Sequence, residues 1–577
     1  MEHTNYWLRR KLSRRTALRG SALTGIGAAS YALVGCGDDD DDDDGNGGDP
    51  TNTPQGLLPT ATSAPTQAPV EVTPGGSFSF QISSPPPSLD PYTSTSFVAS
   101  YNHGLSYSKL YRFAAGVPEV APADNTMEPD LAEAMPEQQD DLTFVITLKD
   151  GLKFHDVAPT NGRALTSEDV AYAFDRYRNL ETSVHKTGLS FIDTVDTPDD
   201  KTVVIKTKAP YADTVSYLGG NLGVWISPAE HAETEAAATK MVGSGPFLNT
   251  AFETGVQLTY AKNPNYYDAP YPYFDDVTAL IVTDQAKRVA DFSSGQVDLT
   301  WLFLPTERDQ LKSQRPDAQF EETQGIGGYI YLRTDKPPFN DKRVRQAISM
   351  ALNRGAIREA ISKGEGVDEQ LYHVGYPYAR QVADLPQAKY WEHNLTEAKA
   401  ALEAAIGAGN TIETTWEHAD AAIYTQAYVD TATLAQAQLA QIGINITDVS
   451  KPYAQYISTT YQGNYEGMGH SPRAVAYWAD FITERFTMTP QRGRINLSYV
   501  TDPDLEVLMD KQRGQFDFEE RIETIRQIEE HVAEEQYEIF FSTDTRTYFW
   551  DAPIRNYRPT AWFPYTHVMK TWRDANA

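Results

Sequence analysis

The sequence predicts a mixed α/β protein with more than one domain. Its 577 residues exceed what one hydrophobic core organises, and the roughly 500 residues after the N-terminal region suggest two to four domains by length alone. From about residue 73 onward, short runs of alternating apolar residues are interleaved with runs of helical periodicity. This interleaving is the pattern of α/β proteins.

The clearest strand pattern lies in LTFVITLKDGLKFHD. Every second residue from Leu142 to Leu148 is apolar, which predicts a half-buried strand. The pair Asp150 and Gly151 predicts a turn, and the residues after it read as a second strand. We therefore expect a hairpin here.

Three helices have sequence signals at their ends. In ALTSEDVAYAFDRYRNL, Thr166 and Asp169 form a capping pattern ahead of an apolar helical face. In DKRVRQAISMALNR, Asp341 is the expected N-cap of a helix that faces the core. In TATLAQAQLAQIGINITDV, a helix is predicted to end at Gly443 and to pass directly into a strand. Such α-to-β passages are common in open sheets.

The first 35 residues have the composition of an export signal. A basic segment containing Arg14 and Arg15 precedes an apolar stretch that is shorter than the roughly 20 residues needed to cross a bilayer. SRRTALR resembles a twin-arginine signal, and LVGC resembles a lipoprotein box that ends at Cys36. The resemblance implies that residues 1–35 are a removed signal peptide and that Cys36 becomes lipidated. The alternative is an inert thiol after an ordinary leader.

Residues 36–74 predict a disordered tether. Seven consecutive aspartates, Asp38 to Asp44, precede a stretch rich in Gly, Pro, Thr and Ala, and a block of like charges stays solvated. Metal chelation by these aspartates is disfavoured because carboxylates on a flexible chain lack fixed geometry. The tether would hold a folded domain away from the membrane.

Composition excludes several function classes. The formal net charge of −30 argues against a nucleic-acid partner, whose phosphates require a basic surface. Because Cys36 is the one cysteine, no intrachain disulfide or thiolate metal site can form. The sequence contains no HExxH, GxSxG or P-loop motif, which disfavours an exported hydrolase.

Eight stretches, taken together and in order, resemble the extracellular solute-binding proteins of family 5, the peptide and nickel receptors of ABC importers. The match spans nearly all of residues 76–570. It is carried by the stretches SLDPY, EPDLAEAMPE, DLTFVITLKDGLKFHD, ALTSEDVAYAFDR, VGSGPF, KNPNYYD, YLRTDKPPFNDKRVRQAISMALNR and LAQIGINI.

The resemblance implies a periplasmic-binding-protein type II fold, in which two lobes joined by a hinge close on a ligand, plus an extra domain. It divides the chain into lobe I (75–107, 242–325 and 536–577), an extra domain (108–241) and lobe II (326–535). Such proteins need an apolar or aromatic cleft with a few fixed polar groups, and closure signals to the transporter.

The resemblance also implies a function. We expect a monomeric, lipid-anchored receptor on the extracytoplasmic face of the cell membrane that captures a small organic solute, above all a peptide, and delivers it to permease subunits. No cofactor, metal or covalent chemistry is expected. The alternatives are a binding lipoprotein or ligand sensor without transport, an exported hydrolase, and a metal receptor built from His373, His418 and His470.

The segment YEGMGHSPRAVAYWADFITERF departs from the family pattern. Peptide-binding members carry a Trp and an acidic pair around a Pro, whose aspartate holds the ligand's amino group, whereas this segment offers His470, Arg473, Trp478 and Asp480. An arginine presents a planar fork of donors that suits carboxylate or phosphate. Alternatively, Asp480 takes over the amine-binding task, or Arg473 and His470 are structural.

Two further segments carry candidate ligand contacts. TTWEHADAAIYTQAY lies where family members present a ligand-binding loop, and its Trp416, His418 and Tyr424 could stack on a ligand. Tyr329 lies near the expected crossing between lobes. Buried aromatic residues more often belong to the core, so a packing role is the alternative for each.

Overall fold

The computed structural model describes residues 72–94, 96–122, 124–183, 186–220, 223–325, 327–373, 376, 378–473, 478–488, 496–560 and 567–577. The expected signal peptide, Cys36 and nearly all of the tether lie outside these residues. No described helix is both long and apolar enough to span a membrane.

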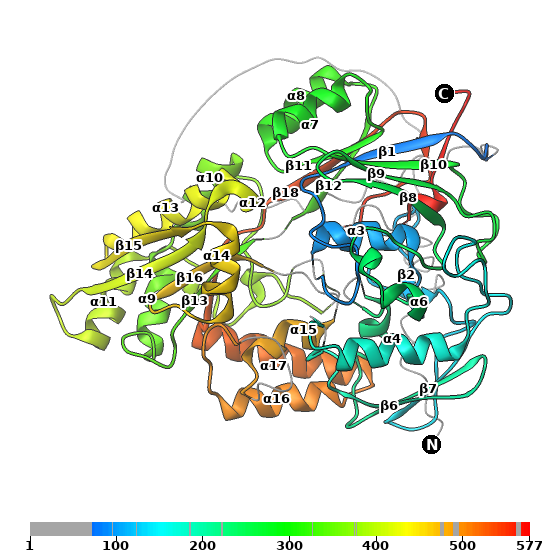
Figure 1. The fold of residues 1–577 in the computed structure, drawn as a ribbon. Coiled ribbons are helices and arrows are strands. Elements are labelled where there is room, and N and C mark those ends of the chain that lie inside the picture. Colours follow the sequence, from blue (N-terminus) through cyan, green and yellow to red (C-terminus); the bar gives the residue numbers. More distant parts are fainter. Residues whose placement is uncertain are drawn as a thin grey trace, which may run out of the picture. The chain divides into compact units, whose positions relative to one another are not determined.

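A seven-stranded sheet has the order β12-β18-β11-β1-β10-β9-β8 (Figure 1). Its central strand β1 (Ser77–Ile82) pairs in parallel with β10 (Asp276–Ile281) and β11 (Leu299–Leu302). The remaining pairs are antiparallel and involve β8 (Phe247–Glu253), β9 (Gln257–Lys262), β12 (Gln319–Gln324) and β18 (Thr545–Trp550). Segments from distant parts of the sequence thus form one sheet.

Helices α7 (Gln285–Ser293) and α8 (Pro305–Gln314) lie next to each other beside this sheet (Figure 1). Phe292 of α7 and Leu311 of α8 are buried with Phe549 of β18 in one apolar cluster. Helix α3 (Phe97–Ser106) contacts β8.

A four-stranded antiparallel sheet has the order β4-β5-β7-β6. Its strands are β4 (Glu137–Gln138), β5 (Thr143–Thr147), β6 (Ile192–Asp199) and β7 (Thr202–Thr207). The strand predicted before Asp150 is confirmed, but the predicted hairpin is wrong. Only a single bridge, Lys153 with Ala164, follows the turn, because β5 instead pairs with β4 and β7.

Helix α4 (Ser167–Asn179) packs on β6 and β7. Its predicted capping box is confirmed: Thr166 and Asp169 reciprocally bond each other's backbone N–H groups. The buried face includes Val170, Phe174 and Tyr177, as helical periodicity predicts.

A five-stranded sheet has the order β15-β14-β16-β13-β17. Its strands are β13 (Gly328–Leu332), β14 (Ile412–Ala419), β15 (Ile444–Lys451), β16 (Met468–Pro472) and β17 (Glu538–Phe540). β14 is parallel to β15 and β16, while β13 is antiparallel to β16 and β17. Helix α13 (Gln426–Ala440) leads into β15 through Gly443 at φ 91°, which confirms that predicted passage.

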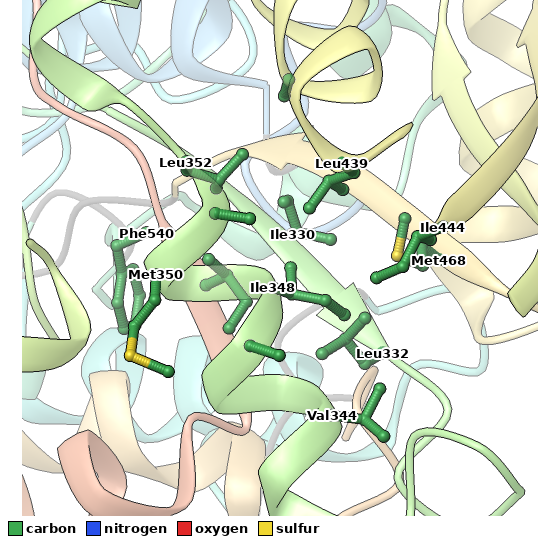
Figure 2. Close-up of a cluster of buried hydrophobic side chains, with 14 of the residues drawn as sticks. Ile330, Leu332, Val344, Ile348, Met350, Leu352, Leu439, Ile444, Met468 and Phe540 are labelled. Carbon is green, nitrogen blue, oxygen red and sulfur yellow. The ribbon is translucent and has the colours of Figure 1, made fainter. Parts of the chain in front are cut away.

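The core of this sheet is assembled around helix α9 (Lys342–Ala351), capped by Asp341 as predicted. Val344 and Ile348 of α9 face Ile330 and Leu332 of β13, and Leu439 of α13 closes the cluster (Figure 2). These side chains are at most 1% exposed. The packing fixes the ends of β13 and β16, where the candidate site begins.

The remaining elements are short or peripheral. The helices are α5 (Thr214–Gly219), α6 (Ala229–Ala232), α10 (Arg354–Ser362), α11 (Leu395–Ile406), α12 (Ala421–Tyr424), α14 (Tyr453–Ser458), α15 (Ala479–Thr483), α16 (Pro503–Arg513) and α17 (Phe518–Glu535). The remaining strands are β2 (Tyr111–Phe113), β3 (Met127–Pro129), β19 (Ile554–Arg555) and β20 (Trp572–Arg573). The 3₁₀ turns are η1 (Glu235–Ala238), η2 (Val382–Asp384), η3 (Ala388–Tyr390), η4 (Thr460–Gln462), η5 (Glu484–Phe486) and η6 (Val568–Lys570).

The division into lobes and an extra domain stays a prediction. One detail differs from it: β17 pairs with β13 through Tyr329 and Phe540, although the predicted boundary placed residues from 536 onward with lobe I. Strand pairing instead puts residues 538–540 in the five-stranded sheet.

Candidate ligand-binding site

Four charged side chains gather beside β13, β16 and β17, and we call them the Arg473 cluster: Arg473, Glu369, Arg485 and Glu538. Arg473 directly follows β16, and its backbone N–H donates to the carbonyl of Gly327 at 2.9 Å. Glu538 opens β17, and Arg485 lies in η5. The cluster therefore depends on chain segments that the five-stranded sheet brings together.

Arg473 is 3% exposed and incompletely paired. Its Nη1 donates to the carbonyl of Gln370 at 2.6 Å, whereas its Nε and Nη2 have no hydrogen-bond partner in the described part of the chain. Burial lowers the pKa of the guanidinium, and the nearby carboxylate of Glu369 opposes that shift. Because arginine stays charged in proteins, Arg473 is a buried cation with two unused donors.

The two carboxylates of the cluster are held away from those donors. Glu369 accepts from the backbone N–H of Gly327 at 3.2 Å and lies 3.6 Å from Nη1 of Arg473. Glu538 pairs with Nη2 of Arg485 at 2.6 Å. Burial raises the pKa of both carboxyl groups. Neither one occupies the free edge of the Arg473 guanidinium.

His470 lies on β16, three residues before Arg473. Its ring stacks on Tyr428 at 4.2 Å between centroids, and its Nδ1 has no partner among the described residues. Burial lowers its pKa well below the ordinary value, so the ring is neutral. A Cβ on Gly328 would lie 2.7 Å from Nε2, which explains why glycine occupies that position.

Five tyrosines near His470 form a connected aromatic surface, which we call the tyrosine cluster: Tyr424, Tyr428, Tyr453, Tyr456 and Tyr461. Tyr424 contacts three of the others at 5.1 to 6.5 Å between ring centroids. The hydroxyls of Tyr428 and Tyr456 both donate to the carbonyl of His470, at 2.6 and 2.8 Å. All except Tyr456 are half-buried, so an aromatic surface remains partly open.

Tyr329 joins the two groups. Its ring lies 4.8 Å from the guanidinium carbon of Arg485, which is within cation–π range. Burial, and then its neighbour Tyr461, raise the pKa of its hydroxyl well above the ordinary value. Three of the residues predicted from sequence thus come from two paired strands: Tyr329 lies opposite Ser471, which follows His470 and precedes Arg473 by two residues.

Trp416 and His418, both on β14, lie deeper. Trp416 is fully buried and belongs to the core of the five-stranded sheet, with its ring 5.7 Å from that of His470. His418 lies 2.6 Å from the carbonyl of Ala419 through Nδ1 and 3.1 Å from Asp448 through Nε2. Both side chains are buried, and ligand contact by either one stays a prediction.

Trp478 and Asp480 lie in a different environment, against residues 211–220. The ring of Trp478 is 5.2 Å from that of Tyr217 and would collide with a Cβ on Gly220. Both oxygens of Asp480 accept hydrogen bonds, from Arg513 and Gln512 on one side and from Tyr211 on the other. This arrangement argues for a structural task rather than for binding a ligand amine.

Asp480 belongs to a second buried network, which we call the Asp213 cluster: Asp213, Asp480, Gln512, Arg513 and Arg521. Arg521 clamps Asp213 through both Nη atoms, at 2.8 Å for Nη1. Gln512 accepts from Nη2 of Arg521 at 2.7 Å. The carboxylates are 3% and 2% exposed. The network joins helices α16 and α17 to residues 211–213.

Sequence reasoning missed Glu369, Arg485, Glu538 and the Asp213–Arg521 pair. Each lies far from its partner along the chain, and single charged residues carry no periodic signal. The GIGG stretch at 325–328 was the one available hint, because a Cβ on Gly327 would lie 2.6 Å from Glu369. Consecutive glycines between strands indicate close approach of other groups.

Two other features do not extend the site. A cavity of about 30 Å³, lined by Lys109, Trp225 and His567 among others, has room for little more than one water. Within the described residues, no three His, Cys, Asp or Glu side chains are placed to hold a metal ion. His373, named above as a metal candidate, instead lies 2.8 Å from the carbonyl of Gly325.

Comparison with known proteins decides the family. The family model "Bacterial extracellular solute-binding proteins, family 5 Middle" matches residues 126–493. The chain belongs to this family. Its members are substrate-binding proteins rather than enzymes, and they work outside the cytoplasm with ABC transporters.

Individual relatives agree with this assignment. The chain is similar to "Heme-binding protein A" of Haemophilus influenzae, at 26% identity over 74% of this chain and 80% of that protein. The solved structure of DppA from Helicobacter pylori with the peptide STSA has a TM-score of 0.74 at 21% identity, covering 87% and 99% of the two chains. AgaA from A. tumefaciens R10, solved with agropinic acid, has a TM-score of 0.73 at 23% identity, covering 86% and 99%. These structures confirm the predicted type II fold.

Proposed function

We propose that this solute-binding protein is the lipid-anchored receptor of an ABC importer. It captures a small organic ligand, with peptides as the class most often bound by its relatives, and delivers that ligand to permease subunits. Family membership supports the receptor role. The export signal, the lipoprotein box at Cys36 and the tether through residue 74 support anchoring at the outer face of the membrane.

The observation that carries this proposal is the Arg473 cluster beside the tyrosine cluster. A buried guanidinium with two free donors, set against a partly open aromatic surface, has the composition of a ligand pocket: apolar walls with a few fixed polar groups. We assign ligand contact to Tyr329, His470 and Arg473. Trp416 and His418 support them, and Trp478 and Asp480 join the site to the rest of the fold.

Native mass spectrometry of the full-length chain, purified in detergent from producing cells, tests solute binding. We expect a co-purifying small mass that is lost on unfolding, and its loss from a Tyr329→Ala, Arg473→Gln double variant. An empty wild-type protein that also fails to import solute when produced with its permease would contradict the proposal. Substitution of Cys36 by Ala should release the protein from the membrane fraction.

A further inference from the structure

Lys109 is a buried amine beside the small cavity described above. It is 3% exposed, and it lines the cavity of about 30 Å³ together with His567. Its Nζ donates to the carbonyls of Gly219 and Gly220 at 2.6 and 2.8 Å and lies 4.3 Å from the ring centroid of Trp225. Two N–H groups are enough for these two hydrogen bonds, so a neutral amine makes both and keeps its lone pair.

Burial leaves this amine largely neutral above pH 7. Desolvation lowers the pKa of Lys109 to about 7, Asp130 opposes the shift, and Arg112 adds to it. The other titratable groups that line the cavity are Tyr107, Tyr266 and His567. Burial raises the pKa of both tyrosines and lowers that of the histidine, so these three side chains are neutral. A desolvated lysine that has lost its proton is a nucleophile.

The cavity and its wall suit one small electrophile. A volume of about 30 Å³ excludes an organic ligand and admits a molecule of roughly two or three heavy atoms. His567 is 5% exposed, and its Nδ1 has no partner among the described residues. In one neutral tautomer this nitrogen donates, here to an oxygen formed beside Lys109. The charges of Arg112 and Lys570 act on the same ring, and Asp130 is already paired with Arg112 at 3.1 Å, so a new anion is offset.

We propose that Lys109 reacts reversibly with dissolved carbon dioxide to form a carbamate that His567 stabilises. The lone pair of Nζ forms a bond to the carbon of carbon dioxide, one C=O π pair moves onto oxygen, and Nζ releases a proton to solvent. The carbamate nitrogen keeps one N–H and therefore holds only one of the carbonyls of Gly219 and Gly220. Because the ring of Trp478 lies against Gly220, the modification reaches the contact beyond helix α5. It does not depend on the proposed receptor function.

Carbon-13 NMR of the full-length protein in detergent tests this modification. The protein is equilibrated with carbon-13-labelled carbon dioxide at pH 6 and pH 8, with the dissolved gas held constant. We expect a carbamate resonance that grows more than tenfold from pH 6 to pH 8. The neutral fraction of an amine with a pKa of about 7 rises roughly tenfold over that range, and the reaction itself releases a proton. Trapping with triethyloxonium, which ethylates carbamates, followed by peptide mapping, then assigns the label to Lys109.

Substitutions test the role of the cavity. Lys109→Arg keeps a cation and donors for the two carbonyls and should remove the resonance. Lys287→Arg, at a lysine whose side chain is 59% exposed, is the matched control and should keep the resonance in full. His567→Leu should reduce the bound carbon roughly tenfold, because a hydrogen bond to a charged group is lost. His567→Asn retains a donor near the position of Nδ1 and should keep most of the bound carbon.

The outcomes decide for or against Lys109. Absence of a carbamate resonance from the wild type at pH 8, or its persistence in Lys109→Arg, would overturn the proposal. Equal trapping at Lys287 and Lys109 in the wild type would also overturn it, and this comparison does not require any variant to fold. An unchanged resonance in His567→Leu would contradict the stabilising role of His567.

Discussion

The Arg473 cluster and the Asp213 cluster contain the same chemistry at similar depth, yet they are paired differently. Arg521 bonds Asp213 through two nitrogens and also bonds Gln512. The Arg473 guanidinium bonds protein only through Nη1, and its other two nitrogens have no partner among the described residues. Both arginines are 3% exposed. Burial and charge are thus equal, and only hydrogen-bond satisfaction distinguishes them.

This difference separates a structural network from a binding site. A buried ion pair with complete hydrogen bonding holds its elements in one arrangement, and removal of one partner leaves an uncompensated charge. A buried donor left unpaired is a candidate for function. The Asp213 cluster joins α16 and α17 to residues 211–213, and the Arg473 cluster keeps two buried donors without an acceptor among the described residues.

The largest expected effect comes from the Asp213 cluster. Arg521→Met leaves Asp213 buried without its partner and should reduce stability by about 3–5 kcal/mol. Chemical denaturation followed by circular dichroism and tryptophan fluorescence measures the loss. Arg526→Met, on the exposed side of the same helix, should change stability by less than about 0.5 kcal/mol.

A double substitution sharpens this test. Arg521→Met combined with Asp213→Leu removes both charges together, and it should recover a large part of the lost stability because no buried charge remains unpaired. If Arg521→Met costs no more than Arg526→Met, the Asp213 cluster does not hold these elements together.

The next effect concerns the space around His470. Gly328→Ala places a Cβ 2.7 Å from Nε2 of His470, and the displaced ring should cost about 1–3 kcal/mol. Since His470 stacks on Tyr428, ligand binding should weaken as well. Gly355→Ala, whose Cβ would meet nothing nearer than 3.6 Å, serves as the control and should be neutral or stabilising within helix α10.

The comparison also shows what sequence can predict. Features that depend on residues close in sequence were predicted correctly. These are the capping box of α4, the Asp341 cap of α9 and the passage from α13 to β15 through Gly443. The predicted hairpin after Asp150 was wrong because tertiary contacts decide which strands pair. β5 pairs with β7, which lies about 60 residues further along the chain.

The choice of candidate site residues depended on local sequence in the same way. Arg473 and His470 stood out because they replace a family pattern within one short segment. The partners Glu369, Arg485 and Glu538 come from three separate segments, and pairing over such separations leaves no local trace. Asp480 lies only seven residues from Arg473, yet it belongs to the other cluster. Proximity in sequence did not fix proximity in space.

A smaller effect is expected when Arg473 is removed from the unliganded protein. Arg473→Met loses one hydrogen bond to Gln370 and should cost at most about 1 kcal/mol, in contrast to Arg521→Met. Glu369 limits the cost because burial already raises its pKa, so it can take up a proton when the guanidinium is gone. Urea denaturation of both variants under the same conditions makes the comparison. A loss for Arg473→Met equal to that for Arg521→Met would make both clusters structural.

The smallest effect is a pH dependence of stability that arises from Glu369. Because burial raises its pKa above the ordinary 4.5, the unfolded chain ionises first, and the stability that the protonated form contributes is lost as pH rises through the folded pKa. Glu369→Gln removes this dependence and keeps an acceptor for the N–H of Gly327. Its melting temperature relative to wild type should therefore be higher at pH 7.5 than at pH 4.

The neighbouring His373 has a pKa lowered to about 3 by burial, so its own titration in the unfolded chain also makes stability depend on pH. Both proteins contain this histidine, and its contribution cancels in the difference between Glu369→Gln and wild type. Glu392→Gln, at an exposed position, is the control and should track wild type at both pH values. A difference between Glu369→Gln and wild type that is the same at both pH values would show that Glu369 is ionised throughout and tightly paired with Arg473. Arg473 would then be paired with a carboxylate as Arg521 is, and hydrogen-bond pairing would no longer distinguish the Arg473 cluster from the Asp213 cluster.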